Sequence, residues 1–118
     1  MLYFLKRLKY RCIWSWQGII VTWREEHSFR SWVWANLVSV IAAFALPLTY
    51  GDRALILALG VLVLAAELIN TGIENAVDFV SEKQHPLARK AKDAGSAGVA
   101  VTAIAAGIAW IVILIGIF

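Results

Sequence analysis

The final segment of the chain carries no charge: from Ala94 to Phe118 every side chain is apolar or uncharged. A second uncharged run extends from Ser31 to Tyr50. As helices, both runs are long enough to cross a bilayer, which takes about 20 apolar residues. The chain is 61% hydrophobic and 16% charged, whereas soluble domains are about 45–50% apolar and about 25% charged. A soluble domain of 118 residues has too little interior to bury this apolar surface, so the sequence predicts a polytopic membrane protein.

The remaining segments complete a single all-α membrane domain over residues 1–118. Its first part, residues 1–30, mixes basic residues with tryptophan and tyrosine, a combination that favours the lipid–water boundary. We therefore expect an amphipathic helix lying in the interface. Three transmembrane helices are expected to follow, at residues 31–50, 54–80 and 94–118, with the second extending into the cytoplasm. The polar segment 81–93, interrupted by Pro86, is expected to be a cytoplasmic loop.

The basic residues indicate the orientation. Ten of the eleven lysines and arginines lie in segments 1–30 and 81–93, and only Arg53 lies at the other end of the first predicted crossing. The positive-inside rule then places the N-terminus in the cytoplasm and the C-terminus on the periplasmic or outer side. Since this asymmetry and anionic head groups account for the net charge of +3, we expect no nucleic-acid partner.

One polar stripe follows the second predicted crossing. Its members lie at offsets of 0, 3, 4, 7 and 11, and so share one helical face: Glu67, Asn70, Thr71, Glu74 and Asp78. Counted from Arg53 at about 1.5 Å per residue, Glu67 is expected about 21 Å into the membrane and Glu74 about 31 Å, at the cytoplasmic boundary. Acidic residues at such depths are costly and indicate function.

We expect the two glutamates to have different roles. Glu74, at the water boundary, suits a divalent cation, because Mg²⁺ takes carboxylate and phosphate oxygens. Glu67, partly removed from water, suits proton abstraction from a lipid hydroxyl. Asn70 lies between them and can orient either partner. For Asp78 two readings stay open: it belongs to the site, or it only pairs with a basic residue or caps the helix end.

Two further groups are expected on the same membrane face. Glu25 or Glu26 supplies a second carboxylate for the metal, and composition does not choose between them. The basic residues after His85 suit phosphate or serve only as a cytoplasmic anchor: Arg89, Lys90 and Lys92. No P-loop pattern is present, so nucleotide chemistry would need another kind of site. A small transporter and a non-catalytic scaffold are alternative classes. A transporter would not need this cluster, and a scaffold would leave both glutamates unexplained.

Longer motifs carry a family resemblance. They are ELINTGIENAVD at residues 67–78, HPLARKAKD at 85–93, SWQG at 15–18, then Trp23, Glu26 and Phe29-Arg30. Together they closely resemble the bacterial integral-membrane diacylglycerol kinase family over essentially the whole chain. The resemblance implies a homotrimer in the bacterial inner membrane. It further implies that the γ-phosphoryl group of ATP is transferred, with Mg²⁺ as cofactor, to a lipid hydroxyl at the cytoplasmic interface.

The resemblance also implies roles for individual residues. Glu67 matches the general base and Asn70 its polar partner, whereas Glu26 and Glu74 match the ligands of the metal and the ATP phosphates. The expected nucleotide-side residues are Arg7, Trp14, Lys83, His85, Lys92 and Asp93. Two of these depart from the family pattern, because Trp14 replaces a common tyrosine and Lys83 a common glutamate. With Glu67, the expected lipid-side residues are Ser15, Arg30 and Ser96. Family sites form between subunits, so Glu26 comes from the same chain or from a neighbour.

Two lipid specificities share this fold, diacylglycerol kinases of Gram-negative bacteria and undecaprenol kinases of Gram-positive bacteria. The SWQG motif and the sequence DAGSA at residues 93–97 look like the first branch, whereas His85-Pro86-Leu87 is common in the second. We favour diacylglycerol as the acceptor, with undecaprenol as the alternative.

Overall fold

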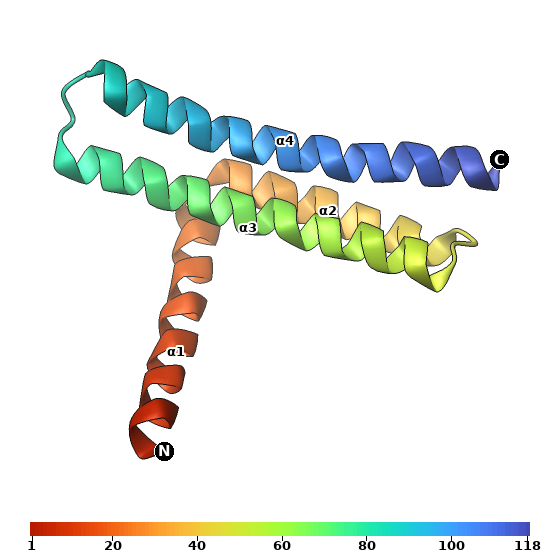
Figure 1. Ribbon diagram of the computed structural model, residues 1–118, viewed down its shortest axis with the longest axis horizontal. Helices are drawn as coiled ribbons and strands as arrows, with labels where there is room; N and C mark the ends of the chain where they lie inside the picture. The colour runs from red at the N-terminus through yellow and green to blue at the C-terminus, as the bar shows by residue number, and fades with distance from the viewer.

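The computed structural model describes all 118 residues as four helices without strands. The helices are α1 (Leu2–Glu25), α2 (His27–Ala45), α3 (Tyr50–Val80) and α4 (Pro86–Ile117). Helices α2, α3 and α4 run alongside one another, whereas α1 projects steeply away from them (Figure 1). The all-helical architecture expected from the sequence is confirmed.

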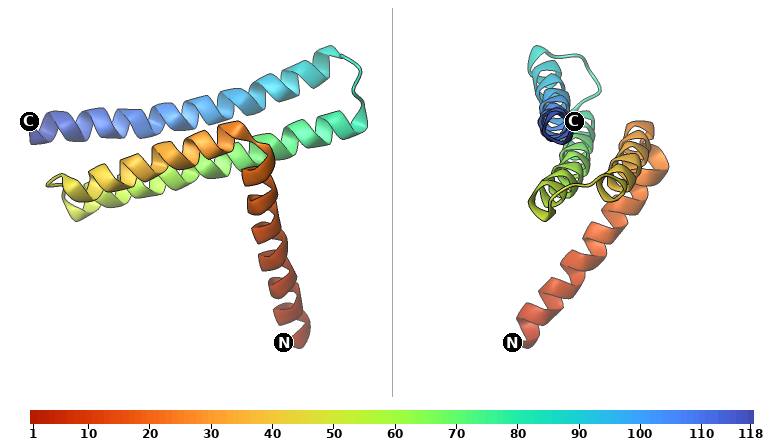
Figure 2. Two further views of the ribbon diagram at one scale, coloured as in Figure 1. Left: turned by 180° about the vertical axis from the view of Figure 1, so that it is seen from behind. Right: turned by 90° about the vertical axis from the view of Figure 1, so that its right-hand side faces the viewer.

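Helix α3 is central, because it packs against both α2 and α4, as the end-on view in Figure 2 shows. Helices α3 and α4 have 31 and 32 residues and are apolar enough to cross a membrane. At about 1.5 Å per residue each is about 46–48 Å long, more than the roughly 30 Å of hydrocarbon. Both helices extend past the start of α2, beyond the corner at which residue 26 joins α1 to α2 (Figure 1). Of the three expected crossings, α3 and α4 therefore have the length and apolarity of spans.

The interior of a single chain is small. Only 12 of 118 residues are buried, and the main apolar cluster joins the ends of α2, α3 and α4 away from the corner: Ala43, Leu48, Ile56, Ala109 and Ile113. Large apolar side chains remain exposed along α4, from Val101 to Ile115. Such a surface needs lipid or protein against it, as expected of a membrane protein.

The surface helix ends earlier than the expected 1–30. It stops at Glu25, and Glu26 has an extended backbone (φ −109°, ψ 109°) that joins α1 to α2. Arg30, from α2, explains the break. Its guanidinium donates to the carbonyl oxygens of Trp23 (2.6 Å) and Arg24 (3.0 Å), which the end of α1 leaves without helical partners. The corner is also packed by Phe29, which is 4% exposed.

The second turn also differs from expectation. The first predicted crossing, 31–50, ends as α2 at Ala45, and α3 begins at Tyr50 rather than at residue 54. Thr49 is the physical reason, because its hydroxyl accepts a hydrogen bond from the Asp52 amide (3.1 Å) and so caps α3 one turn early.

The segment 81–93 is a loop only over residues 81–85, so the expectation of a loop through Asp93 is wrong. Pro86 starts α4 instead of interrupting it, since proline is favoured in the first helical turn. His85 caps the helix, with its Nδ1 accepting from the Leu87 amide (3.1 Å). The residues that follow, Ala-Arg-Lys-Ala-Lys, are strong helix formers.

Candidate active site

Glu67 is the most buried charged residue of the chain, at 4% exposure. It lies on α3, and its Oε1 accepts a hydrogen bond from the Ser28 hydroxyl in the first turn of α2. This contact places Glu67 level with the α1–α2 corner.

Glu74 lies two turns further along the same face and is half-buried. Between the two glutamates, Asn70 is 8% exposed, and its Nδ2 donates to Glu74 Oε1 (3.3 Å). The other side-chain atom, Asn70 Oδ1, is buried without a hydrogen-bond partner. It faces Gly95 of α4, where an added β-carbon would collide with it. The predicted stripe is thus a continuous polar face whose amide group orients Glu74.

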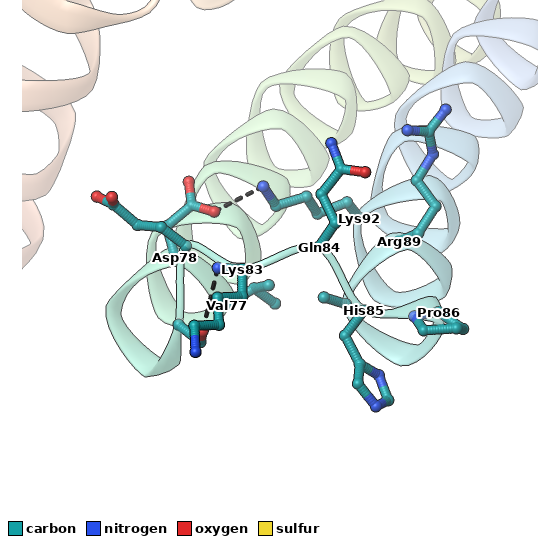
Figure 3. Close-up of a pocket in the computed structure, with 11 residues that line it drawn as sticks. Val77, Asp78, Lys83, Gln84, His85, Pro86, Arg89 and Lys92 are labelled. Atoms are coloured by element: carbon teal, nitrogen blue, oxygen red, sulfur yellow. Dashed lines mark hydrogen bonds and ion pairs between the residues drawn. The ribbon is translucent and has the colours of Figure 1, made fainter.

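Beyond this face, the end of α3, the 81–85 loop and the first turns of α4 line an open cavity of about 390 Å³. Figure 3 shows the Lys92 side chain reaching from α4 toward Asp78 on α3, with an Nζ–Oδ1 distance of 2.6 Å. Asp78 therefore pairs with a basic residue, one of its two expected roles. Lys83, His85 and Arg89 also line the cavity, as does Glu82. With Lys92 and Asp78, the lining thus holds three lysine or arginine side chains and two acids, so basic groups outnumber acidic ones.

Comparison with known proteins identifies the family. The family model for prokaryotic diacylglycerol kinase matches residues 13–114. The chain belongs to the prokaryotic diacylglycerol kinase family. It is accordingly a kinase of lipid metabolism with membrane-spanning helices.

Relatives in this family cover most of the chain. The diacylglycerol kinase of Pseudomonas aeruginosa is 40% identical over 112 residues, covering 95% of this chain and 91% of the relative. The Escherichia coli K12 diacylglycerol kinase is 36% identical over 100 residues, 85% of this chain and 82% of the relative. The undecaprenol kinase of Bacillus subtilis is 36% identical over 88 residues, 75% of this chain and 72% of the relative.

A kinase of this family needs a place for a metal–nucleotide complex. No three His, Cys, Asp or Glu side chains gather as a metal cluster within one chain. A magnesium ion that is shared with ATP needs only one or two protein carboxylates, because phosphates and water complete its octahedron. Glu74 fits this requirement: it is half-buried, oriented by Asn70, and lies on α3 one turn before Asp78, which lines the cavity. Of the two corner acids, Glu26 is half-buried and Glu25 is exposed.

Several expected site residues lie elsewhere in a single chain. Arg7, Trp14 and Ser15 are exposed on α1, which projects away from the other helices (Figure 2). Arg7 donates to the Tyr3 hydroxyl (3.5 Å), and Trp14 stacks on Tyr10. The other outlying residues are on α2 and α4: Arg30 caps α1, Ser96 is exposed, and Asp93 pairs with Arg89 (3.5 Å).

The sequence alone does not predict that two further residues contact the site. Ser28 touches Glu67 from 39 positions away, and nothing in the local pattern predicts that pairing. Gly95 lies in a run of small residues that suggests helix packing in general, but not its contact with Asn70. Both contacts join residues of different helices, so they depend on the tertiary fold.

Proposed function

We propose that the protein transfers the γ-phosphoryl group of MgATP to the hydroxyl of diacylglycerol, giving phosphatidic acid at the cytoplasmic face of the bacterial inner membrane. One observation carries the proposal: Glu67, nearly buried at the α1–α2 corner, lies on the same face of α3 as Glu74, which is one turn before the cavity-lining Asp78. The first acid meets a lipid hydroxyl, and the second meets a phosphate-bound cation.

Glu67 is the general base. Its Oε1 is held by Ser28, and no other hydrogen bond engages the carboxylate, so Oε2 is available to the hydroxyl of the acceptor lipid. As the lipid oxygen bonds to the γ-phosphorus and the bond to the ADP oxygen breaks, the hydroxyl proton passes to Glu67. Placing the base at the corner lets the lipid keep its acyl chains in the membrane while its polar end reacts.

Glu74, with Glu26, would hold the magnesium ion, whose positive charge would offset the negative charge of the ATP phosphates. The nucleotide binds in the cavity between the end of α3 and the start of α4. The basic side chains that line this cavity contact it: Lys83, His85, Arg89 and Lys92. Lys92 is best placed to contact phosphate, because its amino group already lies at the α3–α4 boundary next to Asp78. Three expected nucleotide contacts need a second chain or a repositioned α1 to complete the site: Arg7, Trp14 and Asp93.

The assembly we propose is a homotrimer with three crossings per chain. Helix α2 has 19 residues, about 28 Å, and runs beside α3, which is enough to span with its polar first turns at the boundary. The exposed apolar side chains of α4 supply the surface for lipid and neighbouring chains. The N-terminus is cytoplasmic and the C-terminus is on the periplasmic side.

Undecaprenol is the second candidate acceptor, because the Bacillus subtilis relative carries that name. The deciding experiment incubates the purified protein with radiolabelled ATP and Mg²⁺ in two parallel reactions. One contains micelles with diacylglycerol, and the other contains micelles with undecaprenol. We expect label in phosphatidic acid and little release of phosphate without lipid, since the acceptor supplies the attacking oxygen. Label in undecaprenyl phosphate alone changes the acceptor, and label in neither lipid refutes the proposal.

A further inference from the structure

Ser28 is the only group that holds Glu67. Its hydroxyl donates to Oε1 of the buried carboxylate across the α2–α3 boundary. Ser28 lies in the first turn of α2, where a serine hydroxyl commonly bonds to the backbone. Here the residue at the N-cap is Glu26, no side chain caps the helix, and the Ser28 hydroxyl turns toward α3 instead. An exposed residue thus directs its one polar group to a nearly buried acid.

The consequence follows from the freedom of a glutamate side chain. Its carboxylate plane rotates readily, because the terminal torsion has a broad energy profile. A hydrogen bond to one oxygen fixes that plane and fixes the direction in which the second oxygen points. A charged acceptor makes this bond stronger than one between neutral groups. Because α2 begins at the corner, the bond also sets the orientation of Glu67 relative to the end of α1.

We propose that Ser28 is a positioning residue for the phosphoryl transfer: it holds Oε1 of Glu67 so that Oε2 faces the acceptor hydroxyl. The inference rests on the proposed role of Glu67 as the base. Ser28 does not exchange a proton with the substrate, and its role is exerted through Glu67 alone.

The test compares purified full-length variants by initial rates with MgATP and diacylglycerol. We expect Ser28→Ala to lower kcat about tenfold, the equivalent of one hydrogen bond to a charged group, with the KM for MgATP unchanged. Ser28→Thr keeps the hydroxyl and is expected to restore most of the rate. Ser31→Ala is the matched control, because Ser31 is exposed on the same helix and donates only to the His27 carbonyl (3.1 Å).

A double variant separates positioning from a general structural effect. If Ser28 acts through Glu67, adding Ser28→Ala to Glu67→Gln has no further effect on the residual rate. The proposal is overturned if Ser28→Ala has wild-type kcat, if Ser31→Ala is equally slow, or if the double variant falls further by the full factor of Ser28→Ala.

A second readout does not depend on lipid phosphorylation. A hydrophobic carbodiimide labels membrane carboxyl groups, and peptide mapping by mass spectrometry follows Glu67, with Glu67→Gln as the blank. Removing the hydroxyl frees Oε1, so we expect faster labelling of Glu67 in Ser28→Ala than in the wild type or Ser31→Ala. If the wild type phosphorylates neither lipid, the proposed function fails, yet this labelling still tests the contact. Equal labelling rates of Glu67 in the wild type, Ser28→Ala and Ser31→Ala would refute the contact between Ser28 and Glu67.

Discussion

A β-carbon on Gly95 would collide with the side-chain oxygen of Asn70, so α4 approaches α3 closely enough only because residue 95 is glycine. Asn70 is 8% exposed and its amide nitrogen holds Glu74. Its side chain therefore has little room to yield without releasing that contact. The Gly95–Asn70 contact links the packing of two helices to the orientation of the proposed metal ligand.

We predict that Gly95→Ala lowers the MgATP-dependent rate about tenfold, since overpacking of this kind costs about 1–3 kcal/mol. The Mg²⁺ concentration for half-maximal rate is expected to rise, because Glu74 loses its orienting partner. Gly98→Ala is the matched control: it lies one turn along α4, and a β-carbon there meets nothing within 4 Å. Equal activity of the two variants would show that the Asn70 contact is without functional effect.

Glu67→Gln is expected to lower kcat about 10²–10⁴-fold, the usual contribution of a general base. The KM for MgATP is expected to change little, because Glu67 lies nearly three helical turns before Val77, the first residue of α3 that lines the cavity. Glutamine preserves the size of the side chain and can still accept from Ser28, so the variant should assemble normally by gel filtration. Near-normal turnover of the assembled variant would remove Glu67 from the reaction.

Glu74→Gln is predicted to act differently, through the metal. A neutral amide binds Mg²⁺ poorly, so the rate should recover partly at high Mg²⁺, which a titration of initial rate against Mg²⁺ measures. Glu25→Gln serves as control, because that side chain is exposed at the corner. A Glu74→Gln enzyme with the wild-type Mg²⁺ dependence would contradict the assignment.

The sequence predicted the parts of this molecule that depend on local pattern. The uncharged runs predicted long helices, and the 3.6-residue period placed Glu67, Asn70 and Glu74 on one face, which α3 bears out. Helix ends were predicted less well, because single caps decided them: Thr49 started α3 early and His85 started α4 early. The partners of the site lay beyond sequence reasoning, since Ser28 and Gly95 reach α3 from other helices.

Lys92→Met is predicted to raise the KM for MgATP while leaving the fold intact. Its partner offers a comparison, because Asp78→Asn removes the same ion pair but leaves the positive charge in the cavity. Both side chains are partly exposed, 38% and 53%, and such pairs contribute about 0–1 kcal/mol to stability. We therefore expect similar unfolding temperatures for both variants and a clear KM effect for Lys92→Met alone. Equal KM effects would indicate that the ion pair, rather than the lysine charge, supports nucleotide binding.

Arg53 is predicted to matter for stability rather than turnover. From the first turn of α3 its guanidinium donates to the carbonyls of Ala43 (2.8 Å), in the last turn of α2, and of Leu48 (3.4 Å), in the turn between α2 and α3. Arg53→Met keeps the apolar stem but leaves these carbonyls unpaired, which should cost about 1–3 kcal/mol. Thermal unfolding in detergent measures the loss, and Lys9→Met on exposed α1 is the control. A reduced kcat at temperatures where the variant is fully folded would contradict this role.

Cys12 provides a direct test of the proposed orientation. It is the only cysteine of the chain and is exposed on α1. With α1 on the cytoplasmic face, a membrane-impermeant maleimide should label Cys12 in inside-out vesicles but leave it unmodified in intact spheroplasts. The control carries Cys12→Ser with Phe118→Cys at the exposed C-terminus, and it should show the reverse pattern. Labelling of Cys12 from outside would reverse the topology. The proposed nucleotide cavity, on the same side of the bundle as the α1–α2 corner, would then lie away from cytoplasmic ATP.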